Sequence, residues 1–136
     1  MGHVPIQILL IEDNPGDTRL LRELLAETDS PRFRLTHVDR LSYGIARVKE
    51  GGIDVILLDL SLPDSQGFDT LGQMHGTAAG IPIVVMTGTE DEALGLQLIQ
   101  RGAQDYLVKG QVTGPLLQRS LGYAVERARM ARELQT

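Results

Sequence analysis

The chain has 136 residues, of which 42% are hydrophobic and 23% charged, a balance typical of a single globular domain. Thirteen basic and 18 acidic residues give a net charge of −5, which disfavours nucleic-acid binding because an acidic surface repels phosphate. The absence of cysteine excludes disulfides, zinc–thiolate sites and a cysteine nucleophile.

Neither a membrane segment nor an export signal is evident in the sequence. No apolar run approaches the ~18 residues that a membrane span needs. The first residues also lack a basic segment followed by a long apolar stretch, which a signal peptide requires. We therefore expect no membrane partner, and the cytoplasm is the default location.

Short apolar runs alternate along the chain with segments of helical periodicity. Three of the runs are rich in Ile, Val and Leu without polar alternation, which is typical of strands buried on both faces of a parallel sheet. The second run alternates polar and apolar residues and suits an edge strand. In chain order the predicted strands are Ile6–Ile11, Phe33–Val38, Val55–Leu58, Ile83–Met86 and Tyr106–Val108.

Apolar residues at three- and four-residue spacing predict a helix after each strand. Five strands alternating with five helices predict an α/β fold, a doubly wound five-stranded parallel sheet with helices on both faces. In such sheets ligands bind at the carboxyl ends of the strands. The predicted helices include Leu20–Leu25, Leu41–Val48, Phe68–His75 and Leu94–Ile99, and a longer last helix runs from Gly114 to about Leu134.

Charged or hydroxyl side chains follow four of the five predicted strands. Glu12 and Asp13 follow the first, Asp59 the third, Thr87 the fourth and Lys109 the fifth. Three carboxylates that converge would repel one another, and a hard divalent cation such as Mg²⁺ resolves that conflict. A lysine and a hydroxyl beside such a cation are typical of a site that handles a phosphoryl group.

Asp59 is the best candidate for an aspartate nucleophile that forms an acyl phosphate, because it follows the most apolar and so most central strand. Two of the other residues also have ordinary structural explanations. Asp13 could cap the helix that begins near Pro15. Tyr106 could be a half-buried strand residue.

The chain resembles the receiver domain of two-component response regulators over residues 6 to 124. Four ordered segments carry the resemblance: Ile8–Asn14, Asp54–Asp64 with Gly67 after it, Pro82–Gly88 and Gly102–Lys109. The resemblance implies the flavodoxin-like sheet with strand order 2-1-3-4-5. It also implies a receiver domain over residues 1–124, with residues 125–136 as an extension of the last helix, either a signalling helix or a linker.

The resemblance assigns a phosphorylation site. Asp59 matches the aspartate that accepts a phosphoryl group from a sensor histidine kinase or a histidine phosphotransfer protein. Mg²⁺ or Mn²⁺ would be held by Glu12, Asp13, Asp59 and the backbone carbonyl of Ser61. Lys109 would pair with the carboxylate of Asp59 and then with the phosphoryl group.

The resemblance also implies a switch. Thr87 matches the hydroxyl that bonds to the phosphoryl group, and Tyr106 matches the aromatic side chain that turns inward when Thr87 moves. The surface of helix four, strand five and helix five would change and control a downstream output protein or a fused output domain. The chain is then a signalling module and not an enzyme, beyond promoting its own phosphorylation and dephosphorylation.

One residue departs from the family pattern. Gly110 follows Lys109, where the family usually has a proline joined through a cis peptide bond. A cis bond before a residue other than proline costs roughly 3–4 kcal/mol. We therefore predict a trans bond between Lys109 and Gly110.

The last predicted helix is long for a receiver and leaves two interpretations open. In the first, the apolar stripe packs on the sheet and the helix ends in solvated turns. In the second, residues 125–136 begin a signalling helix. That helix would pair with a second copy in a homodimer or lead into an output domain. The stripe consists of Leu117, Leu121, Ala124, Ala128 and Ala131.

Three rival functions are weaker. A phosphatase with an aspartyl nucleophile needs an aspartate two residues after the nucleophile, where this chain has Ser61. A nucleotide- or flavin-binding module needs a glycine-rich loop, which Asn14-Pro15-Gly16 does not provide. A degenerate receiver that acts only as a docking module is disfavoured by the full acidic set with Thr87 and Lys109.

Overall fold

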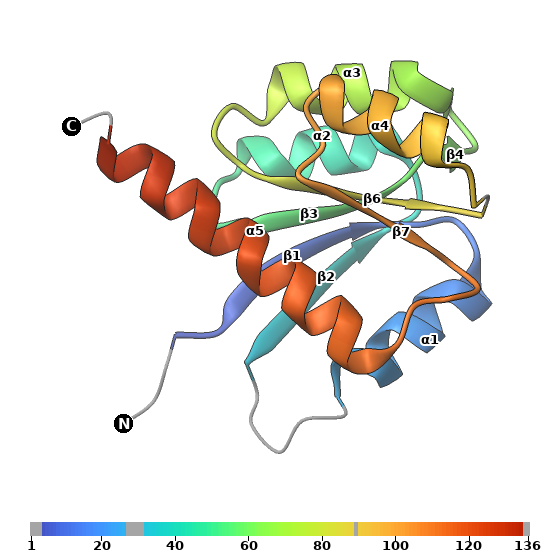
Figure 1. The fold of residues 1–136 in the computed structure, drawn as a ribbon, viewed down its shortest axis with the longest axis horizontal. Helices are drawn as coiled ribbons and strands as arrows, with labels where there is room; N and C mark the ends of the chain where they lie inside the picture. The colour runs from blue at the N-terminus through green and yellow to red at the C-terminus, as the bar shows by residue number, and fades with distance from the viewer. Residues whose placement is uncertain (1–3, 27–31, 89, 135–136) are drawn as a thin grey trace.

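A five-stranded parallel sheet forms the centre of the computed structural model, which describes residues 4–26, 32–88 and 90–134 (Figure 1). Its strands lie in the order β2-β1-β3-β6-β7, and every neighbouring pair is parallel. Numbered among themselves along the chain, the strands have the predicted order 2-1-3-4-5. Their bounds are β1 Ile6–Ile11, β2 Phe33–Val38, β3 Val55–Asp59, β6 Ile83–Thr87 and β7 Asp105–Val108.

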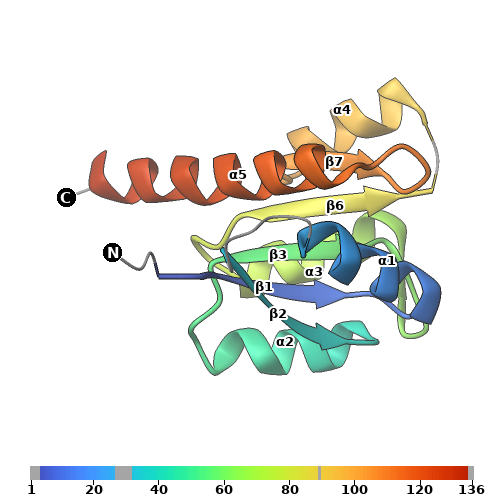
Figure 2. The same ribbon diagram turned by 90° about the horizontal axis from the view of Figure 1, so that it is seen from below.

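In the described part of the chain, five helices cover the two faces of this sheet (Figures 1 and 2). Helices α2, α3 and α4 pack on one face, and α1 and α5 pack on the other. The predicted doubly wound architecture is confirmed, and β2 is an edge strand as its alternating pattern indicated. The helix bounds are α1 Pro15–Leu25, α2 Leu41–Lys49, α3 Gly67–Thr77, α4 Glu92–Gln100 and α5 Gly114–Leu134.

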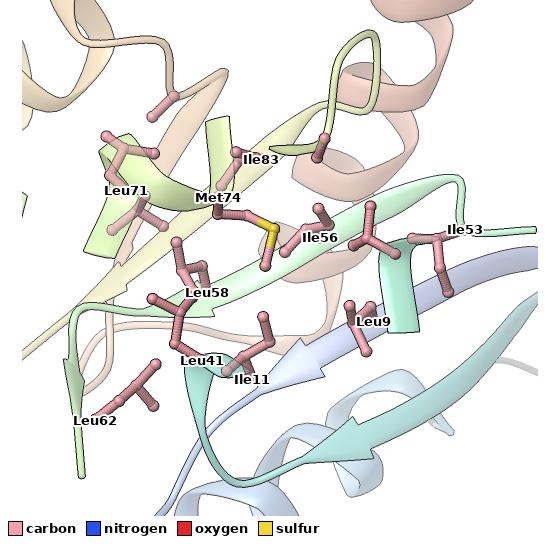
Figure 3. Packing of buried hydrophobic residues seen from close by; sticks show 14 of the residues in the cluster. Leu9, Ile11, Leu41, Ile53, Ile56, Leu58, Leu62, Leu71, Met74 and Ile83 are labelled. Carbon is pink, nitrogen blue, oxygen red and sulfur yellow. The ribbon is translucent and has the colours of Figure 1, made fainter. Parts of the chain in front are cut away.

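Alternate residues of the central strands build two separate hydrophobic layers. Leu9 and Ile11 of β1 pack toward α2 and α3, in the layer of Figure 3, whereas Ile8 and Leu10 pack toward α1 and α5. All four side chains are fully buried. Each contributes roughly 1.5–3 kcal/mol of hydrophobic stabilisation, and this rigid double layer fixes where each strand ends.

A short hairpin that the sequence analysis missed follows β3. Its strands β4 (Ser61–Leu62) and β5 (Ser65–Gln66) are antiparallel, and the turn between them presents Asp64 to the start of α2. The carboxylate of Asp64 accepts hydrogen bonds from the backbone N–H groups of Leu41 (2.8 Å) and Ser42 (2.9 Å). Although burial by itself raises it, these hydrogen bonds together lower the pKa of Asp64. Because the N-cap residue of α2 makes no side-chain cap, Asp64 supplies that cap from a distant segment.

Helix α5 resolves part of the question about the long last helix. Leu117, Leu121 and Ala124 are buried against the sheet, so these three of the five stripe residues belong to the core and cannot pair with another copy. The helix continues as a single segment to Leu134 and extends beyond the sheet (Figure 2). Residues 135 and 136, the last two of the predicted extension, lie outside the described residues.

The described residues contain no cis peptide bond, so the predicted trans bond between Lys109 and Gly110 is confirmed. None of the helices in the described part of the chain combines the length and apolar character that a membrane crossing needs.

Candidate functional site

The predicted site residues meet at the edge of the sheet where the carboxyl ends of the strands lie. Glu12 and Asp13 follow β1 directly, Asp59 ends β3, Thr87 ends β6 and Lys109 follows β7. The registers explain this placement, because neighbouring strands stop within a residue of one another along the central part of the sheet. The sheet thus brings together side chains that are up to 97 positions apart in the sequence.

Three carboxylates form the acidic part of the site. Glu12, Asp13 and Asp59 each offer an oxygen, and these oxygens lie within 4.8 Å of one another. Glu12 and Asp59 are buried, whereas Asp13 is exposed. Burial and the adjacent carboxyl group of Asp59 raise the pKa of Glu12 to about 7. This cluster therefore carries unfavourable electrostatic energy when all three groups are ionised.

Lys109 places one ammonium group among several carboxylates. Its Nζ atom lies 2.9 Å from Asp59 Oδ2, 2.9 Å from Asp17 Oδ2 and 3.1 Å from Glu12 Oε2. Although partial burial lowers it, the hydrogen bonds to Asp59, Asp17 and Glu12 raise the pKa of Lys109 above its ordinary value. The lysine therefore stays charged throughout the physiological pH range.

The donor set fits a hard divalent cation. Glu12 Oε2 is buried and accepts no hydrogen bond, although the Nζ atom of Lys109 lies nearby. The carboxylates of Glu12, Asp13 and Asp59 outnumber the single ammonium group, so negative charge remains uncompensated. An all-oxygen cluster of this kind suits Mg²⁺ or Mn²⁺ better than Zn²⁺ or copper.

The backbone after β1 is held by hydrogen bonds on both sides of the acidic pair. The Asn14 N–H donates to Glu12 Oε1 (3.1 Å), and His37 Nε2 donates to the backbone carbonyl of Glu12 (2.7 Å). Asn14 is also the N-cap of α1, because its Oδ1 accepts from the Asp17 N–H at 3.0 Å. The alternative in which Asp13 caps this helix is therefore wrong, and the Asp13 carboxylate is left for the cluster.

Ser61 lies next to Asp59 in the hairpin that follows β3. Its backbone N–H donates to Asp59 Oδ1 at 3.0 Å, and its hydroxyl donates to Gln66 Oε1 at 3.3 Å. The two oxygens of Asp59 are thus held by different partners, Oδ1 by Ser61 and Oδ2 by Lys109. This arrangement fixes the orientation of the carboxylate at the sheet edge.

Thr87 and Tyr106 lie on the neighbouring strands β6 and β7. Thr87 is buried at the end of β6, and its backbone carbonyl accepts a hydrogen bond from the Lys109 N–H at 2.9 Å. The half-buried ring of Tyr106 packs against α4 at Gly95, where a Cβ atom would collide with the ring. The site and the α4 surface are therefore connected through two adjacent strands.

Sequence reasoning missed two residues that contact the site, Asp17 and His37. Asp17 lies in the first turn of α1, where an acidic residue ordinarily indicates only a favourable helix start. His37 lies near the end of the edge strand β2, and its bond to Glu12 joins residues 25 positions apart. No local sequence signal marks either contact, because both depend on the packing of neighbouring elements.

A doubly wound parallel sheet that gathers carboxylates and a lysine at the carboxyl ends of its strands belongs to the class of α/β proteins with a ligand site at that edge. The family model for the response regulator receiver domain matches residues 8–120, and the chain belongs to this family. Receiver domains are signalling modules of two-component systems and not conventional enzymes. The predictions of family and fold are thereby confirmed.

The chain is similar to known proteins along most of its length. It is 31% identical over 105 residues to the methanogenesis regulatory protein FilR1 of Methanothrix harundinacea, covering 75% of this chain and 23% of that protein. The receiver domain of a putative Luxo repressor protein from Vibrio parahaemolyticus superposes with a TM-score of 0.83 at 26% identity. That match covers 98% of this chain and 99% of the other.

A second solved structure bears on the acidic cluster. The receiver domain of the sensor histidine kinase PA1611 from Pseudomonas aeruginosa has a TM-score of 0.75 at 25% identity, covering 90% of this chain and 99% of that one. That structure has a magnesium ion coordinated in its active site cleft. The chain spans less than two-thirds of the length of curated relatives such as FilR1.

Proposed function

We propose that this chain is a phosphorylation-dependent switch in which Asp59 accepts the phosphoryl group. The donor is the phosphohistidine of a sensor histidine kinase or a histidine phosphotransfer protein. The observation that carries this proposal is the contact of 2.9 Å between Lys109 Nζ and Asp59 Oδ2 inside a buried acidic cluster. A buried aspartate held between an ammonium group and a backbone N–H is oriented to act as a nucleophile.

The proposed transfer is a single displacement at phosphorus. A carboxylate oxygen of Asp59 attacks the phosphorus atom, and the bond between phosphorus and the imidazole nitrogen breaks. The electron pair of that bond returns to the imidazole. In the second half of the cycle, an oxygen of water attacks the phosphorus and the bond between phosphorus and the Asp59 oxygen breaks. The electron pair of that bond restores the Asp59 carboxylate, the water proton passes to solvent, and inorganic phosphate leaves. Lys109 balances negative charge on the phosphoryl oxygens in both steps.

We place a divalent cation, Mg²⁺ or Mn²⁺, in the acidic cluster. The carboxylates of Glu12, Asp13 and Asp59 and the backbone carbonyl of Ser61 would hold it. When bound, the ion supplies neutralisation of the anionic oxygens that approach Asp59. The buried Oε2 atom of Glu12, which accepts no hydrogen bond, supports this placement. The magnesium ion in the PA1611 receiver domain also supports it.

The switch would involve Thr87 and Tyr106. A phosphoryl group adds about −1.5 to −2 charges and three strong acceptors, so it attracts the hydroxyl of Thr87 as well as Lys109. Movement of Thr87 would leave space that Tyr106 can fill, which changes the surface formed by α4, β7 and α5. Phosphorylation shifts this equilibrium only as far as it favours one state over the other.

The output of the switch is a protein or domain that recognises the changed surface. We assign residues 1–124 to the receiver domain and residues 125–136 to an extension that leads toward an output domain or pairs with a second copy. Three exposed apolar side chains of α5, Leu116, Tyr123 and Met130, recur every seven residues and support a homodimer as one outcome. We place the exchange in the cytoplasm, where kinases obtain ATP.

Incubation with Mg²⁺ and a small phosphodonor, acetyl phosphate, tests the proposal. We expect intact mass measurement to detect one phosphoryl adduct on the wild type and on Asp69→Asn, a control that removes an exposed acidic residue of α3. The adduct should be absent from Asp59→Asn and should not form when the divalent cation is chelated. A wild type that stays unmodified by both acetyl phosphate and phosphohistidine donors would support the docking-module alternative instead.

A further inference from the structure

Asp17 gives Lys109 a third anionic partner, and this partner is not one of the clustered carboxylates. Asp17 Oδ2 lies 2.9 Å from Lys109 Nζ, the same distance as Asp59 Oδ2. The Asp17 side chain is one-third exposed (33%), whereas that of Asp59 is only 6% exposed. Lys109 is therefore shared equally between a buried carboxylate of the site and a carboxylate at its rim.

The usual explanation for an acidic residue at this position does not account for the contact. Asp17 occupies the third position of α1 after the N-cap Asn14, where a carboxylate ordinarily reaches back to the N-cap N–H. Here the Asn14 N–H donates to Glu12 Oε1 instead. The Asp17 carboxylate is thus released from the capping arrangement, and its hydrogen bond goes to Lys109 92 positions away.

The position of Asp17 makes it a competitor for the lysine. An ammonium group has three protons, and in this structure they face Glu12, Asp17 and Asp59. A phosphoryl group on Asp59 needs one of these protons for its own oxygens. The bond to Asp17 is the most exposed of the three and the one whose carboxylate has no part in holding the cation.

We propose that Asp17 is a positioning residue that holds Lys109 in the unphosphorylated state and weakens the binding of a phosphoryl group at Asp59. It acts in two ways with the same sign: it competes for Lys109, and its charge repels an incoming anion. This inference rests on the proposed function, since it concerns the regulation of the same site. Asp17 would thereby lower the occupancy of the phosphorylated state and keep the switch off at low donor concentration.

The test measures the affinity of the phosphoryl analogue beryllofluoride for the full chain in saturating Mg²⁺, by ¹⁹F NMR. We expect Asp17→Asn to bind it roughly three- to tenfold more tightly than the wild type, as removal of a partly exposed ion pair predicts. Asp17→Glu, which keeps the charge, should bind with nearly wild-type affinity. Asp17→Ser serves as a second neutral variant should the asparagine variant fold poorly.

A matched control separates the contact with Lys109 from a change of net charge. Asp69 occupies the same third position in α3, is exposed, and accepts a hydrogen bond from Gln73 (2.8 Å). Asp69→Asn should bind beryllofluoride with wild-type affinity. The Mg²⁺ affinity should stay constant or fall slightly in Asp17→Asn, because a nearby anion is lost. A general loosening of the site would instead weaken the binding of both Mg²⁺ and beryllofluoride.

Equal beryllofluoride affinities for Asp17→Asn, Asp17→Ser and the wild type would overturn the role of Asp17. That result leaves the proposed function intact, provided that the wild type itself binds the analogue and forms the adduct on Asp59. Failure of the wild type to bind the analogue or to accept a phosphoryl group would instead contradict the proposed function. The two failures are therefore distinguishable in the same set of measurements.

Discussion

Carboxylates in this protein behave differently because their surroundings differ. The carboxylate of Asp64 accepts two backbone N–H bonds, and its pKa is lowered. That of Glu12 is buried beside Asp59, and its pKa is raised to about 7. Local sequence gives no sign of this difference, since both are acidic residues near the end of a strand. The partners that decide it come from other elements of the fold.

The raised pKa of Glu12 predicts how stability depends on pH when no divalent cation is present. The folded state holds the proton more tightly than the unfolded state, where the pKa has its ordinary value of 4.5. The free energy of unfolding should therefore fall as the pH rises from about 4.5 to about 7, by on the order of 3 kcal/mol from this group, and then level off. Lys109 does not change this window, because its pKa is raised from an already high value.

Urea unfolding of the wild type and Glu12→Gln across this pH range, in a chelating buffer, measures the effect. The difference in stability between the two proteins should change over pH 4.5–7 in favour of Glu12→Gln, which has no charge to bury. The control is Glu23→Gln, which replaces an exposed residue of α1. The pH profile of this variant should stay parallel to that of the wild type. A parallel profile for Glu12→Gln as well would contradict the prediction.

At the scale of elements, regular patterns were predictable and long-range supports were not. The strands and helices follow from the apolar runs and the three- and four-residue spacing, and α5 has the predicted bounds of Gly114 and Leu134. The hairpin of β4 and β5 was missed because each strand has two residues, too few for a period to appear. The cap of α2 by Asp64 was missed because its donor and acceptor are more than 20 positions apart.

The packing of α4 on β7 leads to a second prediction. Gly95 leaves room on α4 for the ring of Tyr106, and a Cβ atom at this position would collide with the ring. Alanine ordinarily stabilises a helix interior by roughly 1 kcal/mol relative to glycine. We expect Gly95→Ala to be destabilising instead, by about 1–3 kcal/mol, because overpacking displaces the ring.

Thermal unfolding together with NMR spectra of the tyrosine ring checks this expectation. Gly72→Ala is the matched control, because it lies inside α3 with no atom near its added Cβ, and it should be neutral or stabilising. Combining Gly95→Ala with Tyr106→Ala should cost no more than Tyr106→Ala alone, because the collision is gone. A Gly95→Ala protein as stable as Gly72→Ala, with an unmoved Tyr106 resonance, would contradict the packing described here.

At the scale of the whole molecule, the stability of the fold is coupled to cation binding at the edge of the sheet. The clustered carboxylates of Glu12, Asp13 and Asp59 come from two strand ends that exist together only in the folded chain. A cation that binds this cluster therefore binds the folded state alone. Binding of this kind adds to the free energy of unfolding in proportion to the logarithm of the ligand concentration.

This linkage predicts that the addition or removal of Mg²⁺ changes the free energy of unfolding of the whole domain. At a Mg²⁺ concentration about a hundredfold above its dissociation constant, the free energy of unfolding should rise by about 2.7 kcal/mol. Thermal unfolding with increasing MgCl₂, compared with NaCl of equal ionic strength, measures this rise. The increase should be lost in Asp13→Asn, whose exposed side chain contributes little to packing. An equal rise with NaCl would mean that screening, and not a site, is responsible.

The sequence by itself determined the family, the order of the elements and most of the residues at the sheet edge. Those properties depend on apolar periodicity and on which residue follows each strand, and both are local. Only the tertiary structure decided which carboxylates meet, that Asn14 and not Asp13 caps α1, and that Lys109 is shared with Asp17. The physical reason is that charge interactions depend on distance in space, which the packing of five strands and their helices sets.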